Sequence, residues 1–595
     1  MRDELKKNNI FSRRILVIGG IKAAFFGILI SRLGYLQIVK HKEYASKANS
    51  NRIRPVLTTP IRGLIFDRNN KPLVKNANNY RLLLYRNKDT DIQKIITNLA
   101  RILKLTPIEK RQIEVALKKS RYKSVISIVS DIAYDDLARL EVNSYKLKGC
   151  VIQSGLKRQY LLDRSTAHIL GYVSLPSSNE ITQKNRELFL NPDFKIGKTG
   201  IEKKYDLSMR GTPGQNQVEI NAYGIPLRTL SEKKPQKGQD IHLNIDANLQ
   251  QYINARLGNL AASATVIDVN DGAILALNST PSFDPNLFVE GISEETWQQL
   301  SQNLKKPLNN KAISALYPPG SVFKLIVAMA ALKNGHDFRH KFTCSGKMRF
   351  GNRVFHCWKK TGHGQINLID AIAGSCNIHF YNLAIELGID KIAETALQFG
   401  LNHKFDIGID GAQSGNIPSD AWKRKIFKQP WQGGDTLNTA IGQGFTLTTP
   451  LQLAVLMAQI ANGGFKITPH LIKGQNNITK TRLIDPSIID LVKYGCNMVV
   501  NSKKGTAYWH RIWKKNYEMA GKTGTSQVIS KRAAELTDAE KEIKAHQNHA
   551  IFAGYAPVNK PKFAISVVVE HGGSGSSTAA PIARDILLKT QQIIT

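Results

Sequence analysis

A serine and a lysine three residues apart form the first pair whose types and spacing could do chemistry. Ser321 follows Pro318-Pro319-Gly320, which forces an irregular approach to the apolar run that begins there. We therefore expect Ser321 at a helix start, Lys324 on the same helical face, and the helix end at Asn334-Gly335. A hydroxyl is a poor nucleophile until a base removes its proton, and a lysine with a lowered pKa can be that base. A serine at a helix start is also often only a cap, and the same spacing recurs at Ser120/Lys123, Ser154/Lys157 and Ser231/Lys234.

A second candidate is the tripeptide Ser375-Cys376-Asn377. It lies between a helical pattern that ends near Ala373 and another that starts near Ile378. A tight loop there can point a hydroxyl and an amide into a cleft. The Ser-x-Asn pattern is common by itself and also occurs at Ser177/Asn179 and Ser414/Asn416.

A third candidate is Lys522-Thr523-Gly524-Thr525, which strand-like segments at 549–558 and 562–570 follow. On an edge strand, a lysine and hydroxyls can bind a carboxylate, and Gly524 lets a substrate approach the backbone closely. The same tripeptide occurs at Lys198-Thr199-Gly200, where we expect only a structural role. Neither copy is a nucleotide-binding loop, because the glycine required five residues before the Gly-Lys pair is replaced by Pro192 or Asn516.

The order of the three motifs is far more specific than any one of them. Ser-x-x-Lys, Ser-x-Asn and Lys-Thr-Gly follow one another along the chain and together resemble the signature of the penicilloyl-serine transferases. Further segments extend the resemblance over nearly the whole chain to the class B penicillin-binding proteins. These segments are Arg62-Gly63, Asp67-Arg68-Asn69, Gly197–Glu202, Gly442-Gln443-Gly444 and Thr449-Pro450.

Within this family, the chain most resembles the penicillin-binding protein 2 branch, the transpeptidases of cell elongation. The segments 317–324, 358–364 and 433–436 carry this likeness, and the division-specific branch is the nearest alternative. The resemblance implies an α+β fold with an elongated pedestal and a transpeptidase domain like those of other penicillin-binding proteins and serine β-lactamases. In that domain a five-stranded antiparallel sheet is packed with helices, and Ser321 opens a buried helix.

The resemblance also implies a serine-type acyl transfer of the D,D-transpeptidase and carboxypeptidase kind. Ser321 would attack the D-Ala-D-Ala carbonyl of a peptidoglycan stem peptide, and Lys324 would take its proton. Ser375 would relay protons to and from the leaving D-Ala and the incoming amine, and Asn377 would hold the amide of the donor peptide. The acyl group would pass to a neighbouring strand, and β-lactams would stall the enzyme at the acyl stage.

The third motif would complete the site. Lys522 would tune the electrostatics of the proton relay, and Thr523, Gly524 and Thr525 would contact the substrate, the two threonines through its carboxylate. The oxyanion would be held by the backbone N–H groups of Ser321 and Thr525. This chemistry needs no cofactor or metal.

Two other outcomes are compatible with the same motifs. A β-lactam hydrolase uses the same first half of the mechanism, but no segment clearly resembles the deacylation base that it requires. A non-catalytic penicillin-binding sensor or scaffold would keep the pocket for binding alone, although the short N-terminal tail leaves no room for cytoplasmic signalling machinery. Turnover of a stem-peptide donor distinguishes the enzyme from a scaffold.

One apolar segment of the sequence is a candidate membrane span. Residues 15–36 reach the ~20-residue length of a membrane span and carry few charges, of which Lys22 is the central one. No small-x-small cleavage site follows directly, which favours a retained anchor over a signal peptide. The basic residues before the span favour a cytoplasmic N-terminus, and the basic residues after it weaken this preference. The former are Arg2, Lys6, Lys7, Arg13 and Arg14, and the latter are Arg32, Lys40 and Lys42.

Composition and length fit this organisation. The 595 residues are 42% hydrophobic and 22% charged, which excludes wholesale disorder and a polytopic membrane protein. We expect a cytoplasmic tail over 1–13, an anchor over 14–38, a pedestal of the dimerisation type over 39–235 with a polar linker at 229–240, and a transpeptidase domain over 236–595. We also expect a hairpin around Asn270-Asp271-Gly272 and a surface helix or flap over 531–547.

The net charge of +37 favours anionic partners without choosing among lipids, glycans and nucleic acid. The resemblance points to stem peptides and β-lactams as ligands and excludes nucleic acid. It further implies a single-pass protein of the bacterial inner membrane with most of its mass in the periplasm. The pedestal would contact a membrane-embedded glycan polymerase and an elongation scaffold.

Three cysteines and a histidine gather in a short stretch that ends inside the second motif. They are Cys344, Cys357, His363 and Cys376. Thiolates and an imidazole are the usual ligands of structural zinc, but these spacings match no standard finger or ribbon. A disulfide between Cys344 and Cys357, or separately buried side chains, is the alternative. The positions are similar to places where some penicillin-binding protein 2 relatives carry metal ligands, with acidic residues in place of Cys344 and Cys357.

Overall fold

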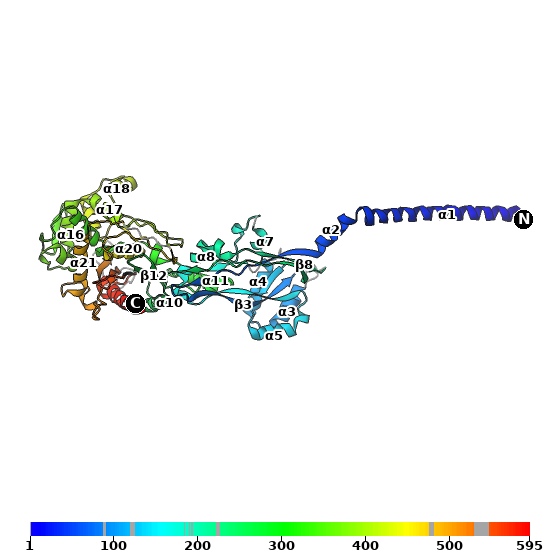
Figure 1. Cartoon of the computed structure of the whole chain (residues 1–595), viewed down its shortest axis with the longest axis horizontal. Coiled ribbons are helices and arrows are strands. Elements are labelled where there is room, and N and C mark those ends of the chain that lie inside the picture. Colours follow the sequence, from blue (N-terminus) through cyan, green and yellow to red (C-terminus); the bar gives the residue numbers. More distant parts are fainter. Residues whose placement is uncertain are drawn as a thin grey trace.

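The molecule is elongated, with a single helix projecting from one end and a large mixed domain at the other (Figure 1). This computed structural model describes residues 2–86, 91–119, 125–183, 185–189, 191, 194–221, 226–474, 481–528 and 547–594. Almost all of the segment 531–547, for which a helix or flap was expected, therefore lies outside the described residues. The pedestal occupies the middle of the molecule and separates the N-terminal helix from the C-terminal domain.

The projecting helix is α1 (Arg2–Gly34), which η1 (Tyr35–Val39) extends. The segment Arg13–Val39 is 27 residues long with a mean hydropathy of 1.8, and no part of its apolar window is buried. Apolar side chains such as Ile15, Ile21 and Phe25 are more than half exposed on it. An isolated helix that is apolar all round is typical of a membrane span. Within the described chain, α1 with η1 is the one helix long and apolar enough to cross a membrane.

The pedestal is built around two long antiparallel strands, β3 and β5, which pair from Val74↔Tyr160 to Leu84↔Cys150. At the far end of this pair, β4 and three helices bury an apolar cluster that includes Leu84, Leu99 and Ile126. A three-stranded sheet, β1-β8-β9, leads back toward α2 and the anchor. The bounds are α2 (His41–Arg52), β1 (Ile53–Thr58), β2 (Ile65–Phe66), β3 (Pro72–Tyr85), α3 (Ile92–Ile102), α4 (Pro107–Lys119), β4 (Val125–Val129), α5 (Tyr134–Val142), β5 (Cys150–Tyr160), β8 (Gly214–Ile220) and β9 (Pro226–Lys233).

The polar segment 229–240 is only in part the linker that its composition predicts. Its first half belongs to β9, which pairs antiparallel with β8 from Gln215↔Lys233 to Ile220↔Pro226. Residues Leu227 and Leu230 of this strand are exposed, so β9 has few apolar side chains to bury. A two-sided polar strand lacks the alternation that identifies strands in a sequence, and this is why the prediction was wrong here.

The C-terminal domain is built on the expected five-stranded antiparallel sheet, in the order β12-β11-β19-β18-β17. Helix α20, buried along its whole length, packs on one face of the sheet, and α10 and α23 pack on the other. The predicted hairpin is confirmed, because β11 and β12 pair across a turn in which Gly272 has a φ of 85°. The bounds are α10 (Ala247–Leu257), β11 (Ala262–Asp268), β12 (Ile274–Thr280), α20 (Pro450–Ala461), α21 (Pro486–Asn501), β17 (Ala520–Ser526), β18 (His549–Ala556), β19 (Phe563–Val569) and α23 (Ala580–Ile593).

The pedestal and the C-terminal domain share one hydrophobic core. Pedestal residues such as Leu73, Tyr160 and Ile201 belong to the same buried cluster as the sheet of the C-terminal domain. The short strand β10 (Ile241–His242), just past the linker, pairs parallel with β2 of the pedestal. The boundary between the two domains is therefore packed and hydrogen-bonded.

A buried cluster of charges lies in the pedestal beside this junction. Glu202, which is fully buried, receives hydrogen bonds from Arg62 Nε at 2.6 Å and from Arg158 Nε at 2.7 Å. Arg62 also donates to Asp206 at 2.7 Å. Burial alone would raise the pKa of Glu202, but the two guanidinium groups lower it below its usual value. Two segments that carry the family resemblance, one at Arg62-Gly63 and one ending at Glu202, thus meet in one ion cluster.

Candidate active site

Ser321 lies where the sequence predicts it, at the start of a buried helix. It is the middle residue of a short 3-10 turn, η5 (Gly320–Val322), which runs into α14 (Lys324–Lys333), and Asn334-Gly335 ends that helix. Gly320 has a φ of 55°, and its N–H donates to the carbonyl of Gly442 at 3.0 Å. The Ser321 side chain is half-buried, and its hydroxyl makes no hydrogen bond within the described part of the chain. A hydroxyl without an internal partner is free to meet a substrate.

Lys324 is fully buried and connects the first motif to the second. Its ammonium donates to Asn377 Oδ1 at 2.7 Å, to the Ser375 carbonyl at 2.9 Å and to Ser375 Oγ at 3.3 Å. Burial lowers the pKa of Lys324 to about 8, although the nearby thiols of Cys376 and Cys357 raise it in part. A fraction of this lysine is therefore neutral near neutral pH and can accept a proton.

Lys522 brings the third motif to the same hydroxyl. Its ammonium donates to Ser375 Oγ at 2.9 Å and to the Thr523 carbonyl at 3.3 Å. Burial, followed by repulsion from Lys324, lowers the pKa of Lys522 well below its usual value. The Ser375 hydroxyl thus lies between two buried lysines, and it can donate to whichever of them is neutral.

The loop that carries Ser375 is held in a conformation that few residues other than glycine adopt. It joins α15 (Leu368–Ala373) to α16 (Asn377–Leu387), as the sequence predicts, and Ser375 has a φ of 54°. This conformation costs of order 1–3 kcal/mol and persists where surrounding contacts require it. Here the indole Nε1 of Trp358 donates to the carbonyls of Gly374 and Ser375 at 3.0 and 3.1 Å.

The third motif lies on β17, the edge strand of the sheet, as expected. A Cβ at Gly524 would meet the Pro319 carbonyl oxygen at 2.9 Å, so β17 passes directly beside the Ser321 turn. Gln443 donates to the Thr525 carbonyl at 3.1 Å, and Thr506 shares a 2.7 Å hydrogen bond with the Thr523 hydroxyl. The sequence offered no signal for Thr506, which belongs to no motif and reaches the site only through the fold.

The other copies of the motifs lie away from this site. Lys198 of the second Lys-Thr-Gly pairs with Glu180 in the pedestal, and Lys157 pairs with Asp131 there. Ser177 belongs to a capping box that closes on Glu180, and Asn416 forms an isolated bridge with Leu447. Ser231 lies on β9, and Ser120/Lys123 lie outside the described residues.

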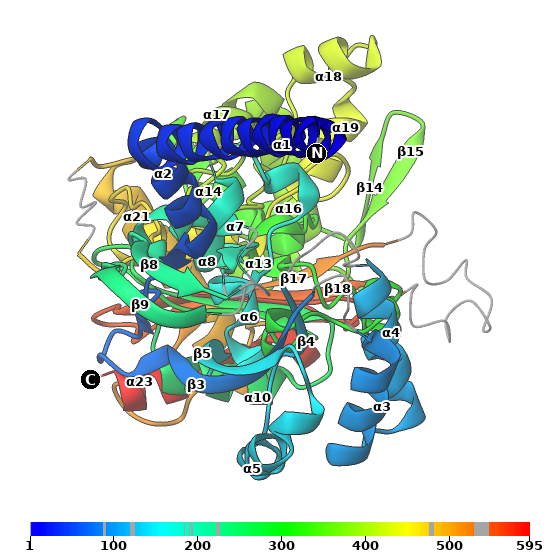
Figure 2. The ribbon, with the colours of Figure 1, turned by 90° about the vertical axis from the view of Figure 1, so that its right-hand side faces the viewer.

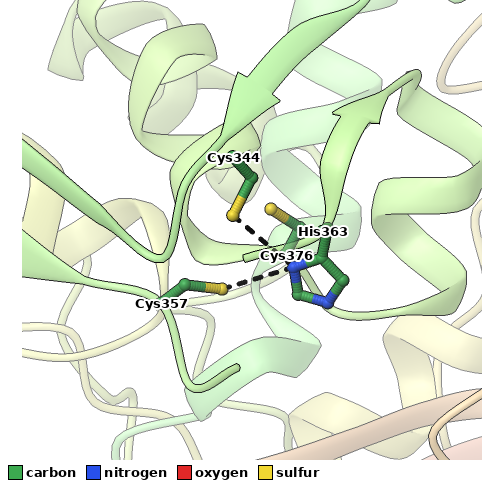
Figure 3. A group of neighbouring side chains, drawn as sticks. All are labelled: Cys344, Cys357, His363 and Cys376. Carbon is green, nitrogen blue, oxygen red and sulfur yellow. Dashed lines mark hydrogen bonds between the residues drawn. The ribbon is translucent and has the colours of Figure 1, made fainter. Parts of the chain in front are cut away.

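The four residues proposed as zinc ligands come together. One ligand atom from each of Cys344, Cys357, His363 and Cys376 lies within 4.8 Å of the others, and the three thiols are buried (Figure 3). His363 Nδ1 lies 3.6 Å from Cys344 Sγ and 3.5 Å from Cys357 Sγ. Cys344 ends β13 (Phe342–Cys344), Cys357 follows β15 (Arg353–His356), and Cys376 lies inside the loop that carries Ser375.

This donor set fits a tetrahedral zinc ion, which three thiolates and one imidazole bind in structural sites. A hydrogen bond from Cys376 lowers the pKa of the Cys357 thiol, as expected for neighbouring thiols that compete for one proton. Cys344 and Cys357 are both free thiols here, so the cluster holds no disulfide.

Comparison with known proteins agrees with this architecture. The penicillin binding protein transpeptidase domain family matches residues 262–588, and the penicillin-binding protein dimerisation domain family matches residues 57–243. The chain belongs to the penicillin-binding protein transpeptidases. Its likeness to the penicillin-binding protein 2 branch is also confirmed, by the relatives described next.

The peptidoglycan D,D-transpeptidase MrdA of Salmonella typhimurium strain SL1344 is 35% identical over 605 residues, 98% of this chain and 96% of that protein. Penicillin-binding protein 2 of Helicobacter pylori, solved in a complex with MreC, matches with a TM-score of 0.80 and 29% identity over 91% of this chain and 99% of its own. A chain from a peptidoglycan synthase complex, solved to explain the coordination of polymerization and crosslinking, matches with a TM-score of 0.72 and 26% identity over 98% and 99% of the two chains.

Proposed function

We propose that this chain is a peptidoglycan D,D-transpeptidase that cross-links stem peptides during cell elongation, through an acyl-enzyme on Ser321. The observation that carries this proposal is the meeting of three motifs at one hydroxyl. Ser375 Oγ contacts both Lys324 and Lys522, and the turn that bears Ser321 adjoins the strand that bears Lys522. Relatives named peptidoglycan D,D-transpeptidase, over nearly the full length, support the same reaction.

In the first half of the reaction, Ser321 Oγ attacks the carbonyl carbon of the penultimate D-Ala while its proton passes to neutral Lys324. The tetrahedral intermediate collapses, the peptide C–N bond breaks, and the terminal D-Ala leaves as an amine with a proton relayed through Ser375. In the second half, an amine of another strand attacks the ester and loses its proton through the same relay. The bond between the acyl carbon and Ser321 Oγ breaks, and the proton returns to the serine oxygen. Every proton moves between groups of the chain and the substrate, and penicillin-binding transpeptidases need no cofactor for it.

The remaining residues bind and orient the donor. We assign the substrate carboxylate to Thr523 and Thr525, and the oxyanion to the backbone N–H groups of Ser321 and Thr525. A Cβ at Gly320 would lie 3.1 Å from the Thr525 nitrogen, which places the two N–H groups on facing segments. In other acyl-transfer enzymes the loss of one such donor lowers the rate by about 10²–10³.

Intact-mass measurement after incubation with a penicillin tests the proposal. We expect one slowly clearing adduct on the unmodified protein and none on Ser321→Ala. Ser154→Ala, which removes the serine of a Ser-x-x-Lys pair in the pedestal, is the matched control and should be labelled normally. Labelling of Ser321→Ala would contradict the nucleophile assignment, and rapid clearance from the unmodified protein would support a β-lactam hydrolase instead.

We also propose the membrane arrangement and the partners. The apolar helix would anchor the chain in the inner membrane by a single pass, with residues 1–13 in the cytoplasm and the pedestal and transpeptidase domain (39–235 and 236–595) in the periplasm. An MreC-type scaffold and a membrane-embedded glycan polymerase would bind the pedestal. Support comes from the similar chains solved with MreC and in a peptidoglycan synthase complex. Co-purification of the full chain with each partner would test this arrangement. Deletion of the pedestal, residues 39–235, should abolish the co-purification.

The cysteine and histidine cluster carries a second, structural proposal. Cys344, Cys357, His363 and Cys376 would hold one zinc ion whose role is to brace the catalytic loop, because Cys376 lies between Ser375 and Asn377. The ion would supply no step of the acyl transfer. Cys376, held together with the other three ligands, would keep the strained loop in place and so keep Ser375 between the two lysines.

A further inference from the structure

An exposed aromatic surface lies in the segment between α21 and β17, outside the three motifs. Trp509 and Trp513 are 81% and 76% exposed, whereas Ala507 and Ile512 beside them are buried. The buried residues anchor the segment to the domain, and η6 (Tyr508–His510) contacts α21 and α23. Exposed aromatic side chains on a fixed base are typical of a binding surface.

The aromatic rings of this segment are joined by one arginine. The guanidinium carbon of Arg511 lies 3.8 Å from the ring centre of Tyr508 and 3.2 Å from that of Trp513. Arg511 also donates to the Tyr508 carbonyl at 2.8 Å, and the rings of Tyr508 and Trp509 pack edge to face with centroids 5.4 Å apart. We call these four residues the aromatic platform. They hold one another in place, so the binding of a ligand has little ordering to overcome.

The platform is surrounded by positive charge. The segment 502–518 contains one acid, Glu518, and five cations, which are Lys503, Lys504, Arg511, Lys514 and Lys515. Of these cations, only Lys504 forms an ion pair among the described residues, with Asp370 at 3.9 Å. A ligand that fits this surface therefore combines negative charge with a face that stacks on aromatic rings.

The segment begins at the candidate active site. Thr506 Oγ1 lies 2.7 Å from Thr523 Oγ1, and the Thr506 carbonyl accepts a hydrogen bond from Ser576 Oγ. The Thr506 N–H donates at 3.3 Å to the carbonyl of Ala373, the last residue of α15 before the loop of Ser375. The platform thus starts two residues past a direct contact with a threonine that we assign to the substrate carboxylate.

The proposed reaction places the acceptor on this side of the site. The acceptor amine attacks the acyl carbon along the path by which D-Ala leaves, because the second half of the reaction reverses the first with another amine. The carboxylate of the leaving D-Ala is assigned to Thr523 and Thr525, so the acceptor approaches across these threonines, and the platform begins beside the first of them. Figure 2 shows α21, which leads into the platform, and β15, whose His356 carbonyl accepts from Asn377, on opposite sides of the C-terminal domain. The platform therefore lies away from the Asn377 side, to which we assign the donor amide.

We propose that the aromatic platform binds the glycan of the acceptor strand. The inference rests on the proposed transpeptidase function and names the surface that holds its second substrate. The C–H faces of the sugar rings stack on Trp509 and Trp513, and the surrounding lysines pair with carboxylates of the stem peptides. An anionic lipid surface would fit the same charges, but the C-terminal domain lies at the opposite end of the molecule from α1, the candidate membrane span (Figure 1).

Calorimetric titration of the full chain with a penicillin bound to Ser321 tests this inference. The acyl group occupies the donor side of the site, so only acceptor binding remains. The probes are a short uncross-linked glycan strand whose stem peptides lack the terminal D-Ala, and the same stem peptide without glycan. We expect the strand to bind about tenfold more tightly than the free peptide.

Two double variants should reduce this preference. Trp509→Ala/Trp513→Ala removes the stacking faces and should bind both probes with similar affinity. Lys514→Gln/Lys515→Gln should lower the preference about threefold, because every stem peptide of the strand ends in a carboxylate and the free peptide supplies only one. Trp297→Ala, which removes an exposed tryptophan of α12 (Glu294–Ser301), is the matched control and should keep the preference.

Labelling of Ser321 by penicillin shows that each variant is folded. Equal affinity for the two probes in the unmodified protein, or a preference that survives unchanged in either double variant, would overturn the inference. Strand binding that is abolished by penicillin at Ser321 would assign the glycan to the donor side and overturn it as well. Absence of a penicillin adduct on the unmodified protein would instead overturn the proposed function, so the two failures are distinguishable.

Discussion

Ser375 Oγ lies 2.9 Å from the ammonium nitrogen of Lys522, although the two residues are 147 positions apart in the chain. The same oxygen lies 3.3 Å from Lys324. Two fully buried ammonium groups around one hydroxyl repel each other, and burial further disfavours their charged forms. The site therefore favours the loss of a proton from one lysine, which is the state that can activate Ser321.

The first prediction concerns pH. A lysine must be neutral to accept a proton, and the neutral form is populated above the pKa, which burial lowers to about 8 for Lys324. The rate constant of penicillin acylation should rise about tenfold per pH unit below 8 and level off above it. Lys324→Arg, which stays protonated, should lose about 10²–10⁴ in rate, whereas Lys333→Arg at the exposed end of the same helix should not. A flat profile from pH 6 to 9.5 would contradict the role of Lys324 as base.

The second prediction concerns a glycine behind the nucleophile. Gly442 has a φ of 68°, and a Cβ there would lie 2.2 Å from the Gly320 carbonyl oxygen, a backbone atom that cannot move alone. Gly442→Ala should displace the Ser321 turn and reduce acylation by about 100-fold. The control is Gly463→Ala, because Gly463 also has a positive φ, 90°, but has open space around it. Similar acylation rates for the two variants would show that the contact does not position Ser321.

The third prediction concerns the stability of the pedestal. Glu202→Gln leaves Arg62 and Arg158 partly unpaired in a buried site, so the free energy of unfolding should fall by about 3–5 kcal/mol. Glu394→Gln breaks a surface pair with Lys333 and should leave the free energy of unfolding nearly unchanged, because water and salt screen an exposed pair. Denaturant unfolding of both variants, followed by circular dichroism, measures the difference. An equal, small change in the free energy of unfolding of both variants would mean that the buried cluster stabilises the protein no more than a surface pair does.

The fourth prediction concerns metal. Protein purified without chelator should contain about one zinc ion per chain by elemental analysis, since the cluster offers one four-ligand set. His363→Ala should lower both the zinc content and the rate of penicillin acylation, because the loop of Ser375 loses its support. His403→Ala, which removes an exposed histidine of the same domain, is the control. Metal-free protein with full penicillin reactivity, or a Cys344–Cys357 disulfide in a peptide map, would contradict the zinc site.

Local signals in the sequence predicted the elements that carry the three motifs. Each of these signals lies within a few residues of its motif. They are the proline and glycine before Ser321, the break between two helical patterns at Ser375, and the apolar strands after Lys522. The five-stranded sheet and the pedestal followed only from the family resemblance. Periodicity cannot give a strand order in which β11 pairs with β19, a strand almost 300 residues further along the chain.

Contacts between distant segments could not be predicted in this way. Thr506 reaches Thr523 because α21 delivers it to the edge of the sheet, and no spacing in the sequence indicates this. The hairpin of β14 (Lys347–Phe350) and β15 likewise meets the start of α19 (Gly433–Ala440) only in the fold, where a Cβ at Gly433 would lie 2.6 Å from the ring of Phe350. Such sites depend on tertiary packing, which a single sequence does not display.

The core shared by the pedestal and the C-terminal domain has a mechanical consequence. Side chains of both domains are buried in one cluster, and β10 pairs with β2, so the junction offers no free hinge. A displacement of the pedestal residues in this cluster is therefore passed on to the domain that carries Ser321. The distance from α1 to the domain that carries Ser321 is then set by the length of the pedestal, which lies between them (Figure 1).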